Sequence, residues 1–262
     1  PDIEAISAIA KANGLPLIVD NTYTTPYLFR PIEYGADIVL HSMTKFIGGH
    51  GAAMGGIVVD AGTFDWKASG RFPSFTEPDP SYHGIKYAED FGNVGLAVKM
   101  RVQVLRDVGG CISPTNAFMM LTGLETLPLR MERHCENAYK LAGWLLSRDE
   151  VAWVNYPDLP DNKNYQRVKK LMPKGSGAMM SFGLKGGFEA GKKIIESIQL
   201  AIHATNLGDV RTIVTHPSST THRQLSKEQL EAAGVPQELI RVSVGIENID
   251  DIIEDFQQAM EK

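Results

Sequence analysis

Two short apolar runs, residues 17–19 and 38–40, most constrain the fold of this chain, because both end directly in polar side chains. Both have the length and β-branched content of buried strands in an α/β sheet. Asp20 follows the first run, and residues 42–45, with the sequence Ser-Met-Thr-Lys, lie just beyond the second. Ligands of open α/β sheets bind outside the carboxyl ends of the strands. We therefore predict that a carboxylate, two hydroxyls and an amine face one crevice.

The side chains at these strand ends predict the chemistry of a ligand. Lys45 lies between an apolar strand and the glycine-rich residues 48–56, and desolvation makes an amine a better nucleophile for a carbonyl. The hydroxyls of Ser42 and Thr44 could bind phosphate oxygens together with backbone N–H groups. Asp20 could keep a pyridine nitrogen protonated, or it could serve as a cap or turn carboxylate. Pyridoxal 5'-phosphate (PLP) has the phosphate, the basic ring nitrogen and the carbonyl that this set predicts.

Further polar residues each keep two interpretations. Thr22 could bond the ring of the ligand or stabilise a turn. Arg241 lies in the apolar strand predicted at residues 239–244 and could point to solvent. It could instead hold the α-carboxylate of an amino-acid substrate, because a planar guanidinium binds a carboxylate with two parallel bonds. Residues 206–209 and 216–222 could close over the same ligand or form ordinary turns.

Three other functional motifs come into consideration, and the residues around each of them argue against it. Ser42 and Lys45 have the spacing of the penicillin-recognising serine hydrolases, but the Ser-Asp-Asn and Lys-Thr-Gly strings of those enzymes do not occur. The glycine-rich segment is no P-loop, because Lys45 precedes the glycines. None of the histidines has the spacing of a zinc site, so we predict no metal.

The composition of the chain argues against nucleic-acid and membrane partners and favours a reducing compartment. The net charge of −5 indicates neither a nucleic-acid surface nor an anionic membrane. No apolar run approaches the about 20 residues needed to span a bilayer. Two cysteines favour a reducing compartment over a disulfide framework, and we expect a cytoplasmic protein.

The order of predicted elements indicates two domains. Strands and helices alternate in the first part, which predicts a mostly parallel sheet with helices on its faces. Residues 69–93, rich in aromatics and prolines, predict a long ordered loop inserted into this domain. Pro128 should divide a long helical segment. We place the larger domain at residues 1–127 and a small α+β domain with a mixed or antiparallel sheet at residues 128–262.

Several strings spread over the chain resemble the Cys/Met-metabolism family of PLP-dependent enzymes, which includes cystathionine γ-synthase and methionine γ-lyase. They are residues 19–22, 42–45, 123–127 with 130–131, 216–217 and 241–247. The resemblance implies an α/β fold of the PLP-dependent transferase type, like that of aspartate aminotransferase. Residue 1 is a proline at the start of a predicted helix. The chain would be the C-terminal portion of such an enzyme and incomplete alone.

The resemblance also implies roles for individual residues. Lys45 would be catalytic and would carry the cofactor as a Schiff base, and Asp20 would be the partner of the pyridine nitrogen. Cofactor-binding roles are implied for five residues: Asp20, Thr22, Ser42, Thr44 and Lys45. Substrate-binding roles are implied for Asn206 and Arg241. A missing N-terminal portion of the same protein would supply further ring and phosphate contacts, in a homo-oligomer built as a dimer of dimers.

Within the family, three features are most similar to the O-acetylhomoserine sulfhydrylases: residues 206–209, residues 219–222 and the insertion at 69–93. The implied reaction belongs to methionine biosynthesis. It is a γ-replacement in which sulfide or a thiol displaces acetate from O-acetylhomoserine, giving homocysteine or methionine. Cystathionine γ-synthase or methionine γ-lyase activity is the alternative within the family. A non-catalytic fragment that associates with a partner chain is the alternative from another class.

Overall fold

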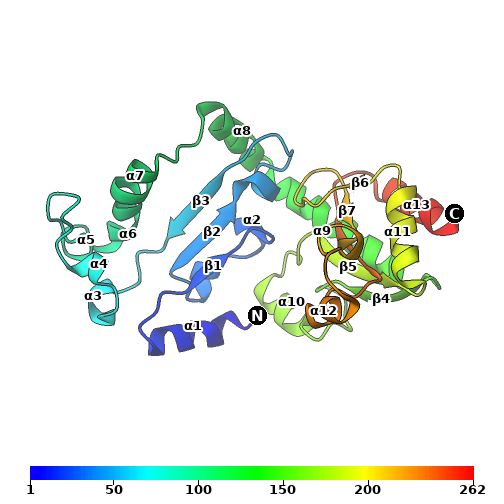
Figure 1. Ribbon diagram of the computed structural model, residues 1–262, viewed down its shortest axis with the longest axis horizontal. Coiled ribbons are helices and arrows are strands. Elements are labelled where there is room, and N and C mark those ends of the chain that lie inside the picture. The colour runs from blue at the N-terminus through cyan, green and yellow to red at the C-terminus, as the bar shows by residue number, and fades with distance from the viewer. The chain divides into compact units, whose positions relative to one another are not determined.

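The computed structural model describes residues 1–262, which divide into two compact units (Figure 1). The first unit comprises Pro1–Thr22, Arg30–Met43 and Met54–Met119, and the second comprises Tyr23–Phe29, Thr44–Ala53 and Met120–Lys262. Each unit has its own sheet. None of the helices combines the length and the apolar character needed to cross a membrane. The boundary between domains at residue 127 stays a prediction.

The sheet of the first unit has three strands in the order β1-β2-β3. Their bounds are Ile18–Asp20, Ile38–Ser42 and Gly56–Asp60. The expectation of a mostly parallel sheet is confirmed for β1 and β2. It is wrong for β3, which runs antiparallel to β2. Parallel strands need a crossover, usually a helix, whereas the glycine-rich connection from β2 turns back on itself, with left-handed backbone at Gly49 and Gly51.

Helix α1 (Ile3–Ala12) precedes this sheet and begins as its sequence predicts, because the Asp2 side chain accepts a hydrogen bond from the backbone N–H of Ala5. Short helical turns follow β1 at α2 (Thr25–Leu28) and η1 (Pro31–Tyr34). A further turn, η2 (Met43–Ile47), follows β2 and contains Lys45.

Residues 69–93 correct the expectation of a long loop, because they belong to a chain of short helices with an aromatic core. The elements are α3 (Trp66–Ser69), α4 (Pro73–Thr76), α5 (Tyr87–Asp90), η3 (Gly92–Val94), α6 (Gly95–Lys99), η4 (Met100–Leu105) and α7 (Arg106–Val108). Trp66 stacks on Phe75 with ring centroids 3.9 Å apart. The buried Tyr87 donates a 2.7 Å hydrogen bond to Asp79. Four-residue helices show no hydrophobic period, so only their tertiary packing reveals them.

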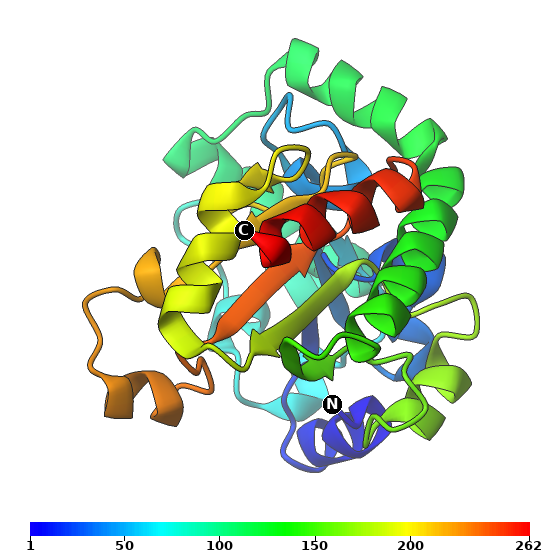
Figure 2. The ribbon, with the colours of Figure 1, turned by 90° about the vertical axis from the view of Figure 1, so that its right-hand side faces the viewer.

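The second unit contains a five-stranded sheet in the order β4-β5-β8-β7-β6. The strands are β4 (Val151–Asn155), β5 (Met179–Leu184), β6 (Ile202–His203), β7 (Ile213–Thr215) and β8 (Leu239–Ser243). All neighbours are antiparallel except β6 and β7, so of the two predicted alternatives, a mixed or an antiparallel sheet, the sheet is mixed. Figure 2 shows α9 (Leu127–Leu146), α11 (Gly187–Ser197) and α13 (Ile249–Glu261) lying against this sheet. Phe182 of β5 and Phe256 of α13 meet edge to face in the core between them.

Pro128 divides the long helical segment, as expected. Helix α8 (Pro114–Glu125) ends before it, and the proline occupies the first turn of α9, where its missing N–H costs nothing. The remaining helical elements are α10 (Tyr165–Leu171), η5 (Pro217–Ser219) and α12 (Lys227–Ala232). Helix α9 buries polar side chains as well as apolar ones, among them Arg130, His134 and Asn137. These face the chain segments that carry the candidate site.

Candidate active site

In the first unit, the polar residues at the ends of β1 and β2 are joined by hydrogen bonds. The Asp20 carboxylate accepts from the backbone N–H of Thr22 at 3.0 Å. The Thr22 hydroxyl oxygen accepts from the backbone N–H of Ser42 at 2.8 Å. The parallel register of the two strands explains this, because Asp20 lies opposite Leu40. The structure thus brings together three predicted residues, and the Thr22 hydroxyl links the end of β1 to the end of β2; the role of Thr22 toward a cofactor stays a prediction.

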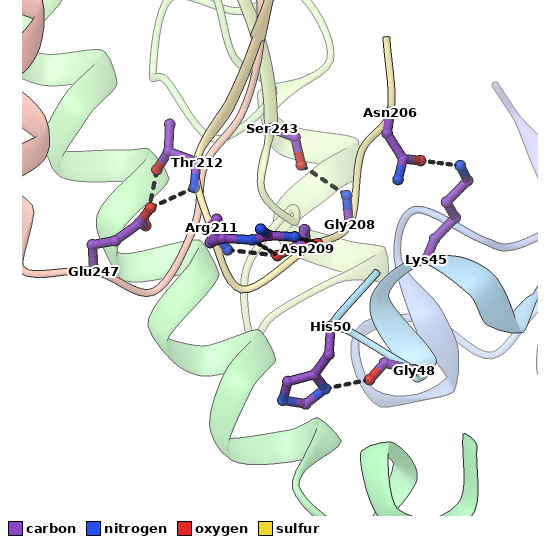
Figure 3. A network of polar contacts seen from close by, with 10 residues as sticks. All are labelled: Lys45, Gly48, His50, Asn206, Gly208, Asp209, Arg211, Thr212, Ser243 and Glu247. Carbon is purple, nitrogen blue, oxygen red and sulfur yellow. Dashed lines mark hydrogen bonds and ion pairs between the residues drawn. The ribbon is translucent and has the colours of Figure 1, made fainter. Parts of the chain in front are cut away.

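In the second unit, Lys45 is half-buried and lies on a break in its helical turn. Its φ and ψ of −90° and −131° are not helical, although the residues around it form the η2 turn. Its carbonyl accepts a 2.7 Å hydrogen bond from the N–H of Gly49, which closes the turn behind it. Its amine donates to the side-chain oxygen of Asn206 (Figure 3). Two predicted residues separated by 161 positions are therefore in direct contact.

The loop that carries Asn206 packs on the backbone of Lys45 through Gly208. A Cβ atom on Gly208 would lie 2.7 Å from the Phe46 nitrogen and 2.8 Å from the Lys45 Cβ. Gly208 also has a φ of +74°, in the left-handed region that favours glycine. Its N–H donates to the hydroxyl of Ser243 at 2.9 Å, which ties the loop to the end of β8. Sequence reasoning considered Gly208 only as part of the polar segment 206–209, and nothing in the sequence indicated its contact with Lys45.

Arg241 reaches the same loop from β8. Its Nη2 atom donates to the carbonyl oxygens of Thr205 at 2.9 Å and Asn206 at 3.3 Å. The guanidinium is thus held against the loop rather than extended freely into solvent. Asn206 connects the two cations of the candidate site, since its side chain binds Lys45 and its backbone binds Arg241. A role for Arg241 toward a substrate carboxylate stays a prediction.

Two ion-assisted contacts hold the rest of this loop (Figure 3). The buried Asp209 carboxylate accepts from Arg211 Nε at 2.9 Å and from Nη2 at 2.8 Å. Burial opposes its charge, yet the hydrogen bonds from Arg211 leave the pKa of Asp209 below its usual value. Glu247 accepts from the backbone N–H of Thr212 at 2.5 Å and from its hydroxyl at 3.0 Å. The first contact braces the turn around Val210 from within, and the second ties Thr212 to the segment that follows β8.

His134 of α9 packs against Phe46, the residue that follows Lys45. Its ring meets the Phe46 ring edge to face, with centroids 5.2 Å apart, and its Nδ1 lies 2.7 Å from the Val244 carbonyl oxygen. The side chain has no exposed surface, and burial lowers the pKa of His134 to about 4. The imidazole is therefore neutral at neutral pH, and its Nδ1 carries the proton that the carbonyl accepts.

Acid is expected to weaken the folded state through His134. The pKa of His134 is about 4 in the folded protein and 6.5, its usual value, in the unfolded chain. The unfolded chain therefore binds a proton at this histidine first as the pH falls. The free energy of unfolding should then fall by about 2 kcal/mol from this group between pH 7.5 and pH 5. Urea denaturation of the whole protein at both pH values measures it. His134→Gln should show a smaller drop, whereas the exposed control His203→Gln should retain the full drop; equal slopes in both variants would contradict the assignment.

The architecture of the chain is that of a PLP-dependent enzyme. Residues 1–261 match the model of the Cys/Met metabolism PLP-dependent enzymes, and the chain belongs to this family. The family resemblance predicted from the sequence is thereby confirmed.

The relatives of the chain include enzymes of sulfur metabolism. The homocysteine synthase of Schizosaccharomyces pombe is 52% identical over 263 residues, which cover 100% of this chain and 61% of that protein. The O-acetyl-L-homoserine sulfhydrylase of Leptospira meyeri is 50% identical, and the match covers 99% of this chain and 60% of that protein. The chain thus spans about three-fifths of the length of these relatives.

Solved structures show the same fold. A Campylobacter jejuni structure described as an O-acetylhomoserine (thiol)-lyase has a TM-score of 0.93 and 40% identity, covering 100% of this chain and 62% of that one. It contains N'-pyridoxyl-lysine-5'-monophosphate. The metB protein of Corynebacterium glutamicum has a TM-score of 0.78 and 36% identity, covering 99% of this chain and 58% of that one. The predicted α/β architecture of PLP-dependent enzymes is confirmed over this part of their length.

Proposed function

We propose that the whole protein containing this chain catalyses a PLP-dependent γ-replacement, in which sulfide or a thiol displaces acetate from O-acetylhomoserine. The observation that carries the proposal is the contact of the Lys45 amine with Asn206, whose backbone also binds Arg241. The Lys45 amine, which we expect to react with the cofactor, and the Arg241 guanidinium, which we expect to bind a carboxylate, thereby contact one loop. The similarity to a homocysteine synthase and an O-acetyl-L-homoserine sulfhydrylase favours this substrate.

The side chains that we expect to bind PLP have the chemical groups that this cofactor requires. Gly208 leaves no room for a side chain against Lys45, so the lysine is held by a loop that a Cβ would displace. Asp20 would bind the pyridine nitrogen, Ser42 and Thr44 would bind the phosphate, and Lys45 would hold the carbonyl carbon. When bound, PLP supplies an electron sink for the negative charge that develops on the substrate.

The residues of the chain would then orient the substrate and move protons. Asn206 orients the Lys45 amine with a neutral amide oxygen, which adds no negative charge beside it. Lys45 would carry protons to and from the Cα and Cβ atoms of the substrate. Arg241 would fix the α-carboxylate with its planar guanidinium, which selects an amino acid over a simple amine.

Product analysis tests this function. The whole protein, incubated with PLP, O-acetylhomoserine and sulfide, should release homocysteine and acetate in equal amounts. It should also show an absorbance band at about 420 nm that borohydride abolishes. Cystathionine from cysteine would support a cystathionine γ-synthase instead, and a keto acid with a thiol from methionine would support a methionine γ-lyase. Absence of the band would rule out all three and leave the non-catalytic alternative.

A further inference from the structure

Arg130 is a buried cation whose described acceptors are all uncharged. Only 5% of its surface is exposed. Nη1 donates to the carbonyl oxygen of Phe46 at 2.7 Å, and Nη2 donates to those of Ile47 at 3.0 Å and Gly123 at 2.6 Å. Nε donates to the hydroxyl of Thr126 at 3.1 Å. Burying a guanidinium is costly, so its donors must be satisfied, and here carbonyl and hydroxyl oxygens satisfy them.

Two of these carbonyls belong to the residues that directly follow Lys45. Phe46 and Ile47 end the η2 turn, and the last carbonyls of a helical turn lack partners within it. One planar guanidinium binds both, which a lysine ammonium cannot do with the same geometry. Gly49 makes the space, because its left-handed backbone places an added Cβ on top of the Arg130 Nη1 atom. The turn behind Lys45 is therefore built around this guanidinium.

The same face of α9 also holds the segment that follows β8. His134, one turn after Arg130, lies against the Phe46 ring and the Val244 carbonyl. Asn137 donates from Nδ2 to the carbonyl oxygens of Gly245 at 3.1 Å and Glu247 at 2.8 Å. A single 20-residue helix thus contacts both the turn that bears Lys45 and the chain that leaves the strand of Arg241.

We propose that Arg130 is a positioning residue for Lys45. Through the carbonyls of Phe46 and Ile47 it sets the backbone from which the amine reaches Asn206, and α9 keeps that backbone in register with β8. This inference rests on the proposed function and deepens it. A displacement of about 1 Å at a reacting group costs on the order of 100-fold in rate, so the role of Arg130 should appear in kcat rather than in substrate binding.

The substitution Arg130→Lys tests the proposal in the whole protein loaded with PLP. We expect kcat for homocysteine formation to fall by about 10- to 100-fold, while KM for O-acetylhomoserine stays within about threefold. The pH midpoint of the band at about 420 nm should also shift, because the lysine that forms it is displaced. Arg133→Lys is the matched control. Arg133 lies on the same helix, is exposed and pairs with Glu136 at 3.4 Å, so kcat and the pH midpoint should not change.

A second, milder variant covers the case in which Arg130→Lys does not fold. Thr126→Val removes the acceptor of Arg130 Nε at nearly constant volume and should lower kcat about threefold to tenfold, with KM unchanged. The proposal is overturned if the folded variants lose only thermal stability and keep the kcat and pH midpoint of the unsubstituted protein. Failure of the proposed function is distinct, because the unsubstituted protein would then lack the band or the product.

Discussion

Replacing Lys45 by alanine is expected to lower kcat for homocysteine formation at least about 1,000-fold in the whole protein. The change removes the amine that would hold the cofactor and the group that would move protons at the substrate. The lost contact to Asn206 is a single hydrogen bond between side chains and should leave the fold intact. Steady-state kinetics, and mass spectrometry of the borohydride-treated protein, measure the two consequences.

Two further variants distinguish the loss of the Lys45 amine from the loss of its positive charge and from the loss of any lysine. Lys45→Arg keeps a positive charge but does not release its proton, so it should be as inactive as Lys45→Ala. The exposed Lys185 of the second unit serves as the control, and Lys185→Ala should keep full activity. Retention of more than a tenth of kcat by Lys45→Ala would refute the role assigned to this lysine.

Gly208→Ala is expected to have the second-largest effect. The left-handed backbone at φ +74° costs a side chain about 1–2 kcal/mol. The new Cβ would also lie 2.7 Å from a backbone nitrogen that cannot rotate away, and overpacking of this kind costs about 1–3 kcal/mol. We expect a loss of about 2–5 kcal/mol in the free energy of unfolding. A roughly 100-fold lower kcat should accompany it, because the atoms displaced are those of Lys45 and Phe46.

Gly234 supplies the matched control, because it has the same left-handed backbone conformation as Gly208 but no neighbouring atoms that an added Cβ would meet. Its φ is +70°, and an added Cβ would meet no atom within 4 Å. Gly234→Ala should therefore cost only the backbone part of about 1–2 kcal/mol and leave kcat unchanged. Urea denaturation and steady-state kinetics of both variants give the difference. Equal losses in the two variants would show that Gly208 does not hold Lys45 in place.

The cluster at the ends of β1 and β2 could be predicted because its signals are local. Apolar runs of strand length precede Asp20 and Ser42, and neighbouring parallel strands end at the same edge of a sheet. The division at Pro128 was predictable for the same reason, since a proline acts on the helix that contains it. The antiparallel β3 was not, because strand direction depends on how the glycine-rich connection turns.

The supports of Lys45 carry no local signal. Arg130 reads as a charged residue on an amphipathic helix, and only the fold places it on carbonyls 84 and 83 residues away. Gly208 reads as a turn residue, and its contact with Lys45 exists only after the loop has docked on β8. Arg241 was left open between solvent and ligand, because periodicity gives a face of a strand but not what covers that face.

The sequence by itself predicted which groups would perform the chemistry. Lys45, Asp20 and the hydroxyls of Ser42 and Thr44 stand out because each polar residue type follows a short apolar run. Only the tertiary structure decided what holds the lysine. Asn206 and Arg130 act through hydrogen bonds to the turn of Lys45 that join residues 83 to 161 positions apart, and Gly208 acts through close packing on Lys45. Such contacts form only when the chain folds. Every residue has a backbone carbonyl that can accept a hydrogen bond, so no residue type in the sequence indicates where such a contact will form.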